Sequence, residues 1–168
     1  MVGRFLLIGI LLLWSGLGQA QTKVEKKAKA YSEIKSLVAS EDFIFMADTA
    51  LPNWGSSISL VTNDNHLHIR GKTVDAHMPF FGEGRLGTDY PGGGPIILDG
   101  EIKDYKIRFD DRKRTITIQF YVKGASERHD VILEMSGGGY AKLVITSMSR
   151  SRMVYRGRVM AYKEENEG

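Results

Sequence analysis

The segment HLHIRGKTVDAH, residues 66–77, carries three histidines and one aspartate at alternate positions. Gly71 followed by Lys72 suits the two central positions of a type II′ turn, the first of which needs the positive φ that glycine tolerates. Polar and apolar residues alternate on either side of this turn, as they do in half-buried strands. The segment therefore predicts a hairpin. Its buried face would consist of Leu67, Ile69, Val74 and Ala76.

The register of this hairpin predicts a metal site on its other face. It pairs His66 with His77 and His68 with Asp75, which brings the four polar side chains together. Imidazole and carboxylate groups bind divalent ions, so these residues could hold zinc or copper. The alternative is a solvated polar face, which strand alternation produces without any metal.

Two acidic residues, Asp99 and Glu101, lie in LDGEIKD, residues 98–104. On a strand this spacing puts both carboxylates on one face, and a carboxylate pair can carry out glycoside hydrolysis. Alternation alone also explains two acids on a solvated face, and no serine stands in a nucleophile-elbow pattern. A hydrolase that uses these acids is kept as an alternative, and a catalytic residue is not assigned.

A glycine-rich stretch, GEGRLGTDYPGGGP at residues 82–95, invites comparison with phosphate-binding loops. Such loops need a following helix, and a Walker loop also needs a lysine and a serine or threonine. A proline and a predicted strand follow instead, which excludes this class. Long loops often carry function, and four aromatic residues could line a ligand-binding mouth here. They are Phe80, Phe81, Tyr90 and Trp54. The competing interpretation is that they anchor the loop to the core.

The hydrophobic period predicts the elements that would position these residues. Residues 21–41 have an apolar stripe with a period of three to four, which predicts one amphipathic helix docked on a sheet. The stripe consists of Val24, Ala28, Tyr31, Ile34 or Lys35, and Val38. Within residues 42–162 the period is two, which predicts about ten short strands. No helical stretch separates them, so they must be antiparallel. The predicted fold is mainly β: a barrel or sandwich with one N-terminal helix.

A second hairpin is predicted around FDDRKR, residues 109–114. A turn centred on Asp111 and Arg112 would pair Ile107 with Ile116, and Tyr105 with Ile118. The core face of this hairpin would consist of Ile107, Phe109, Ile116, Ile118 and Phe120.

Residues 1–20 have the features of a secretory signal peptide. Arg4 supplies a positive charge, residues 5–14 are apolar, and SGLGQA ends in small residues at the cleavage positions. The apolar run is shorter than the roughly 20 residues of a membrane-spanning helix, so no transmembrane segment is expected after cleavage. The protein is therefore expected in the periplasm or outside the cell, with residues 163–168 as a disordered tail.

The remaining 168 − 20 = 148 residues suffice for one domain with one core. The absence of cysteine excludes thiol catalysis, thiolate metal sites and disulfides. Without Arg4 the formal net charge falls from +3 to +2. These charges form no basic block in the sequence, which argues against nucleic-acid binding.

Four blocks of the sequence resemble the pattern of domain-of-unknown-function family 4251, found in exported proteins of Bacteroidota. The blocks are FIFMADTALP (43–52), LHIRGKTVDAHMPFFG (67–82), GGGPIILDGEIKDY (92–105) and YRGRV (155–159). The resemblance implies a location in a Gram-negative envelope and a single helix-plus-sheet domain, and it implies no activity. The glycine run and Tyr90 match the family pattern, whereas histidine is not required at positions 66, 68 and 77.

These observations predict an exported periplasmic protein that is a non-catalytic binding or accessory module of the cell envelope. Its partner would be a small molecule, a glycan or another envelope protein, and no cofactor is expected. The first alternative is a divalent-metal binder that holds zinc or copper on the hairpin at residues 66–77. The second alternative is a hydrolase that uses the carboxylates near Asp99.

Overall fold

The computed structural model describes residues 22–83, 94–124 and 127–163. In these ranges a helix at residues 22–39 is followed by nine strands. The strands are β1 (Asp42–Leu51), β2 (Ile58–Ser59), β3 (His66–Arg70), β4 (Thr73–Met78), β5 (Ile96–Asp110), β6 (Thr115–Lys123), β7 (Arg128–Ser136), β8 (Tyr140–Ser147) and β9 (Met153–Met160).

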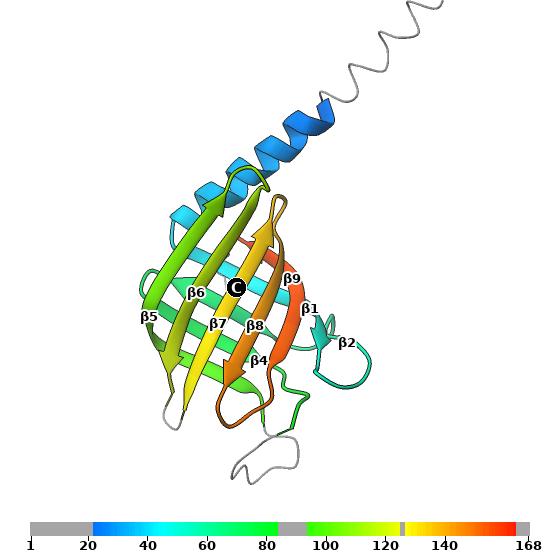
Figure 1. Cartoon of the computed structure of the whole chain (residues 1–168), viewed down its shortest axis with the longest axis vertical. Coiled ribbons are helices and arrows are strands. Elements are labelled where there is room, and N and C mark those ends of the chain that lie inside the picture. The colour runs from blue at the N-terminus through cyan, green and yellow to red at the C-terminus, as the bar shows by residue number, and fades with distance from the viewer. Residues whose placement is uncertain (1–21, 84–93, 125–126, 164–168) are drawn as a thin grey trace, which may run out of the picture.

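The strands form one antiparallel sheet that closes into a barrel (Figure 1). Hydrogen-bonded neighbours follow the order β1-β3-β4-β5-β6-β7-β8-β9, and β9 pairs with β1 to complete a ring of eight. β2 is an additional short strand on the edge of β1. Side chains that point inward fill the core; Ile118, Leu133 and Leu143 are fully buried. The predicted mainly β fold with one N-terminal helix is confirmed, and it is a barrel.

The closing pair, β1 with β9, depends on a glycine. The register shifts between Ala47 and Thr49, so Asp48 forms a bulge in β1. A Cβ added to Gly157 would lie 1.9 Å from the carbonyl oxygen of Met46. No side chain fits there unless β9 moves away from β1, so glycine at position 157 permits the close approach that seals the barrel.

A side chain completes the opposite edge of β1. β3 pairs with residues 42–45 of β1 and β2 pairs with residues 49–50, which leaves the backbone of Ala47 between them. The Ala47 N–H donates to Asn65 Oδ1 at 2.7 Å, and Asn65 Nδ2 donates to the Ala47 carbonyl oxygen at 3.1 Å. Asn65 is 1% exposed. Its amide group therefore takes the place of a neighbouring strand.

The hairpin of β3 and β4 has the predicted register. His66 pairs with His77, His68 with Asp75, and Arg70 with Thr73. Gly71 has a φ of 57°, as the predicted turn requires. All four apolar residues predicted for the inner face, Leu67, Ile69, Val74 and Ala76, are buried.

The predicted register of the β5–β6 hairpin is wrong by two residues. Ile107 pairs with Ile118, and Phe109 pairs with Ile116, because the connection is a four-residue turn at residues 111–114. Asp110 Oδ1 accepts the Lys113 N–H at 2.9 Å, and Arg114 closes the turn with a φ of 55°. A shift of two keeps every side chain on its predicted face.

β5 also differs from the prediction in length and in burial. It is continuous where two strands were predicted, because Asp104, with a φ of 53°, forms a bulge opposite β6. Ile107 was predicted to be core, but it is 36% exposed. β4 pairs with β5 only as far as Glu101, so Ile107 has a neighbouring strand on one side only.

The helix packs on one end of the barrel through its C-terminal half only (Figure 1). Tyr31, Ile34 and Val38 are buried in the core, whereas Val24 is 56% exposed and Ala28 is exposed. Tyr31 Oη donates to Asp111 Oδ1 at 2.8 Å, and burial together with this carboxylate raises the pKa of Tyr31 to about 12. The Tyr31 hydroxyl is therefore a stable donor that fixes the helix to the β5–β6 turn.

In the described part of the chain, no helix is long and apolar enough to cross a membrane. The predicted signal peptide, residues 1–20, and residues 164–168 of the predicted tail lie outside the described ranges.

Candidate functional site

A groove of about 460 Å³ runs over the outer face of β1, β3, β4 and β5. Its apolar floor comes from Ile44 and Met46, two residues of β1 that point outward. Met160 of β9 pairs with Ile44 and is 43% exposed beside this floor. Outward positions of a barrel strand are normally polar, so an apolar strip there is a departure from simple alternation.

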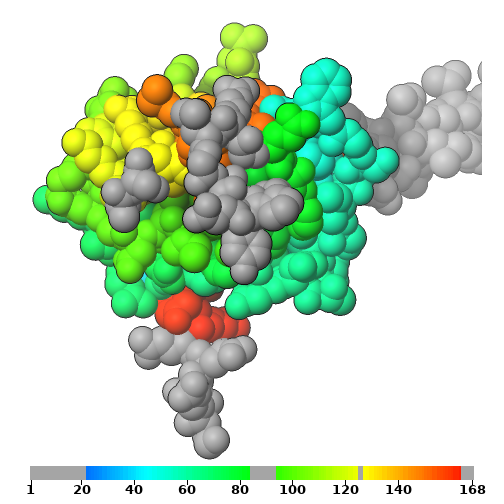
Figure 2. Space-filling model, turned by 90° about the horizontal axis from the view of Figure 1, so that it is seen from below, coloured from blue at the N-terminus to red at the C-terminus, as the bar shows by residue number. Residues whose placement is uncertain are grey.

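One wall of the groove is a stack of side chains around Tyr162. This residue follows β9, where the end of the described chain projects from one side of the barrel (Figure 2). The Tyr162 ring stacks on His68 with centroids 4.1 Å apart and 20° between the planes. His68 Nε2 lies 2.8 Å from Asp42 Oδ1, and the Arg70 guanidinium lies 5.7 Å from the Tyr162 ring. His68 is consequently only 7% exposed although it points outward.

The opposite wall is acidic. Asp75 and Asp99 are cross-strand partners on β4 and β5, and such like-charged pairs destabilise a sheet unless they are compensated. His66 Nε2 lies 2.9 Å from Asp75 Oδ2. Among the described residues, neither Asp99 nor Asp64 forms an ion pair, and both line the groove. The groove therefore offers two uncompensated carboxylates next to an apolar floor.

The four residues of the predicted metal site are divided between different partners. His66 faces Asp75, whereas His68 faces Asp42 and Tyr162. His77 pairs in register with His66 but does not line the groove. Within the described ranges, no group of three or more histidine, aspartate or glutamate side chains is arranged to hold a metal ion. Zinc or copper binding at this hairpin stays a prediction.

The two residues of the predicted carboxylate pair lie on the exposed face of β5, but their surroundings differ. Asp99 lies in the groove, whereas Glu101 Oε2 lies 2.5 Å from Lys103 Nζ. The hydrogen bond and the charge of Lys103 lower the pKa of Glu101. A general acid in glycoside hydrolysis needs a raised pKa, so this shift has the wrong direction for that role.

The aromatic residues of the predicted loop mouth have different environments. Phe80 is buried in the core, with the Arg150 guanidinium 5.3 Å from its ring. Phe81 is 38% exposed and Trp54, between β1 and β2, is 85% exposed. Tyr90 lies outside the described residues. Phe80 therefore anchors its segment to the core, as the competing interpretation predicted.

A partly buried polar cluster near the ends of the glycine-rich stretch was not predicted. Glu127 Oε1 lies 3.3 Å from His129 Nε2 and 3.5 Å from Arg150 Nε. Burial opposes ionisation of Glu127, but hydrogen bonds from Ser149 and Ser147 and the charge of His129 outweigh it and lower its pKa. Burial also lowers the pKa of His129, against the attraction of Glu127.

The segment between β8 and β9 holds the residues on both sides of positions 84–93. Arg150 donates to the Gly94 carbonyl oxygen at 2.6 Å. On the other side, Ser151 Oγ accepts the Glu83 N–H at 3.0 Å, and the Ser151 N–H donates to the Glu83 carbonyl oxygen at 3.0 Å. A charged residue in a polar turn such as SRSR carries no sequence signal of burial, so pattern analysis could not identify this cluster.

Comparisons with known proteins identify similarities in sequence and in fold. Residues 25–159 match a family model described as "Domain of unknown function (DUF4251)". The chain is similar to the crystal structure of a DUF4251 family protein from Bacteroides eggerthii DSM 20697. That match has 19% sequence identity and a TM-score of 0.65, and it covers 83% of this chain and 93% of the other. No curated protein matches the chain.

Proposed function

Because the chain belongs to DUF4251, a family of domains of unknown function, we propose its function from the groove on the outer face of the barrel. The protein is a non-catalytic binding module of the cell envelope that holds a small ligand in this groove. The observation that carries the proposal is the combination of an apolar floor with unpaired carboxylates. Ile44 and Met46 form the floor, and Asp64 and Asp99 face it without ion-pair partners in the described chain.

The groove favours a ligand with an apolar part and a cationic or hydrogen-bond-donating part. The apolar part would cover Ile44 and Met46 and remove them from water, which is the main source of affinity in such sites. An amine would compensate the charge of Asp99, which faces Asp75 across the strands. Charge-assisted hydrogen bonds of this kind are about twice as strong as neutral ones. Small amphipathic amines therefore fit the groove better than acids do.

Two observations support a binding role over catalysis. Lys103 lowers the pKa of Glu101, which is the opposite of what a general acid needs. The groove side chains instead hold one another in fixed contacts, such as the stack of Tyr162 on His68. Fixed side chains lower the entropic cost of binding. An envelope location is supported by the signal-like sequence of residues 1–20.

The test is a titration of the ¹⁵N-labelled chain with hexylamine, followed by NMR chemical shifts. Hexanoate and hexanol serve as ligands of equal length with opposite or no charge. We expect hexylamine to shift the backbone resonances of Met46, His68 and Asp99, and to bind more tightly than hexanol. Hexanoate should bind most weakly. Equal affinity for the three probes would contradict the assigned role of the carboxylates.

Two pairs of variants connect the binding to the groove. Tyr162→Ala removes one wall and should weaken hexylamine binding about fivefold or more. Tyr140→Ala is its control, because Tyr140 is 57% exposed and also lies under an arginine, with Arg158 4.2 Å from its ring. Asp99→Asn should weaken hexylamine binding and leave hexanol binding unchanged. Asp130→Asn removes an exposed acid of β7 and should leave both unchanged.

The same spectra separate the groove from the other predicted sites. Shifts confined to Trp54 and Phe81 would overturn the groove and favour the loop mouth. A second titration, with one equivalent of zinc, tests the metal-binding alternative. If His66, His68 and His77 shift together in slow exchange with zinc, the metal-binding alternative replaces the proposal.

A further inference from the structure

A second groove, of about 490 Å³, lies between the N-terminal helix and the β5–β6 and β7–β8 turns at the end of the barrel on which the helix packs. One wall is the helix, with Lys23, Lys26 and Lys27. The other wall is the β5–β6 turn, with Arg112, Lys113 and Arg114. Its remaining lining comes from Ala30, from Ser136 at the end of β7 and from Gly137 of the β7–β8 turn, so no acidic side chain lines it. We name this feature the basic groove.

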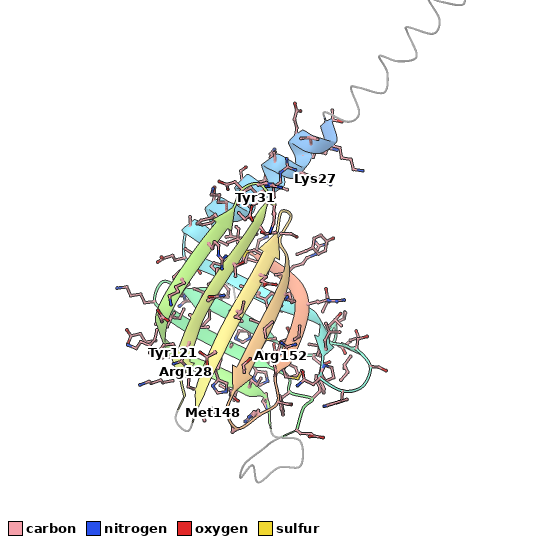
Figure 3. All side chains as sticks on the ribbon, in the orientation of Figure 1. Lys27, Tyr31, Tyr121, Arg128, Met148 and Arg152 are labelled. Atoms are coloured by element: carbon pink, nitrogen blue, oxygen red, sulfur yellow. The ribbon has the colours of Figure 1, made fainter. Side chains whose placement is uncertain are left out.

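The two walls are held together by tight contacts. A Cβ added to Gly137 would lie 3.4 Å from Tyr31 Cβ and 3.5 Å from the Lys27 carbonyl oxygen, so the helix lies directly on this turn. The Gly137 N–H donates to the Arg114 carbonyl oxygen at 3.3 Å. Lys27 lies on the part of the helix that extends from the barrel, and Tyr31 lies where the helix meets it (Figure 3).

The cations of the basic groove have little compensation. Lys113 Nζ lies 3.9 Å from Asp110 Oδ2. None of the other five basic residues forms an ion pair with any part of the chain that the structure describes. The nearby acid Asp111 is already engaged, because Lys35 Nζ and Tyr31 Oη both lie 2.8 Å from its Oδ1. Six positive charges therefore line one concave surface, and among the described residues Asp110 is the one acid that forms an ion pair with any of them.

This arrangement is unfavourable for the unliganded protein. Lys26 and Lys27 follow Lys23 by three and four residues, so these lysines share one helix face, where like charges repel. The turn adds three consecutive cations across the groove. Solvated lysines on a helix are ordinary, but their convergence with a second basic segment 85 or more residues away in the sequence is a tertiary feature. An anion bound between the walls would compensate the charges of both basic segments.

We propose that the basic groove binds a ligand that carries two or more phosphate groups. Lysine binds phosphate as a point charge, and arginine binds it through two parallel hydrogen bonds. The helix wall supplies lysines and the turn wall supplies both arginine and lysine, so one phosphate group can contact each wall. This site is distinct from the groove over β1, β3, β4 and β5, and its test is independent of the proposed function.

The test uses calorimetric titration of the purified chain with tripolyphosphate at low salt, with orthophosphate as the single-phosphate comparison. We expect one tripolyphosphate per chain, bound at least tenfold more tightly than orthophosphate. Added salt should weaken binding, because mobile ions screen exposed charges. The combined variant Lys23→Gln, Lys26→Gln, Lys27→Gln removes one wall, and Arg112→Gln with Lys113→Gln reduces the other. Each should weaken binding about tenfold, the sum of several exposed charge pairs.

A control removes three charges elsewhere, the same number as the lysine variant of the helix wall. Lys72, Lys123 and Arg152 are exposed and lie outside the basic groove, and Arg152 is toward the other end of the barrel (Figure 3). Their combined change to glutamine should alter affinity less than twofold. If the control weakens binding as much as the wall variants do, net charge alone is responsible and the proposal fails.

Vesicles distinguish the source of the phosphate. Phosphatidylglycerol vesicles that bind the chain while tripolyphosphate does not would overturn the proposal and identify a membrane-docking surface. Failure of both probes would overturn it as well. Circular dichroism of each variant checks that the barrel is folded. We expect every variant to fold, because all the substituted side chains are exposed.

Discussion

Replacing Asn65 should be among the most destabilising single changes to a polar residue of this protein. The side chain is 1% exposed and bonds to both backbone groups of Ala47, at 2.7 and 3.1 Å, on the edge of β1 opposite β9, where no strand pairs with this residue. Asn65→Ala leaves a buried N–H and a buried carbonyl without partners. Each unsatisfied group costs about 1–3 kcal/mol, so we expect a loss of about 2–6 kcal/mol, reduced toward the lower figure if water enters.

The assay is urea unfolding of the variant and the unchanged chain, followed by circular dichroism. Asn63→Ala is the control, since Asn63 is exposed and contributes only its backbone oxygen to Asn65. It should cost less than about 0.5 kcal/mol, as exposed substitutions do. Equal unfolding midpoints for the two variants would refute the assignment of Asn65 as a substitute for a strand.

Asn65→Asp adds a pH dependence to the same test. The new carboxylate can accept from the Ala47 N–H, but its second oxygen faces the Ala47 carbonyl oxygen and must be protonated to donate. The folded state should therefore raise the pKa of Asp at this position above the unfolded value of roughly 3.9. The unfolded state then loses its proton first, so stability should fall as pH rises above about 4. A loss of stability that is independent of pH would contradict this geometry.

Three further changes test other parts of the structure. Gly157→Ala should destabilise the barrel by about 2–3 kcal/mol because its Cβ would lie 1.9 Å from the Met46 oxygen, whereas Gly94→Ala, with no atom nearby, should be neutral in the same urea assay. Tyr31→Phe removes the bond to Asp111 and should cost about 1 kcal/mol; unchanged stability would mean that apolar packing alone holds the helix. Burial lowers the pKa of His129, so the unfolded state binds a proton first and the protein should lose stability as pH falls below roughly 6.5. His129→Gln should flatten this loss in urea midpoints measured at several pH values, and an unchanged slope would assign it to other groups.

The sequence was most informative where a local rule determines the structure. The β3–β4 register followed from Gly71 and the alternation on either side of it, and all four expected inner residues are buried. The β5–β6 register was missed because both a two-residue and a four-residue turn suit FDDRKR, and only the latter places Arg114 at a positive φ. The face assignment survived this error because the two registers differ by an even number of residues.

The candidate sites were predicted less well, because they depend on contacts between distant segments. His68 was expected to share its hairpin's polar face, but Tyr162, 94 positions later, covers it. The basic groove combines residues 23–27 with 112–114, two short basic segments that lie 85 or more residues apart in the sequence. Asn65 lies in a polar turn sequence, where nothing distinguishes a buried amide from a solvated one.

By itself the sequence determined the mainly β class, the N-terminal helix, the inner and outer faces of the strands, and the family. The first three of these properties depend on the period of apolar residues along the chain, which any short window reveals, whereas the family follows from the resemblance of four sequence blocks. The tertiary structure alone decided that the sheet closes, that β1 is completed by Asn65, and which charges meet in the two grooves. The physical reason is that pairing β1 with β9 and docking the helix depend on fit and compensation between side chains far apart in the sequence.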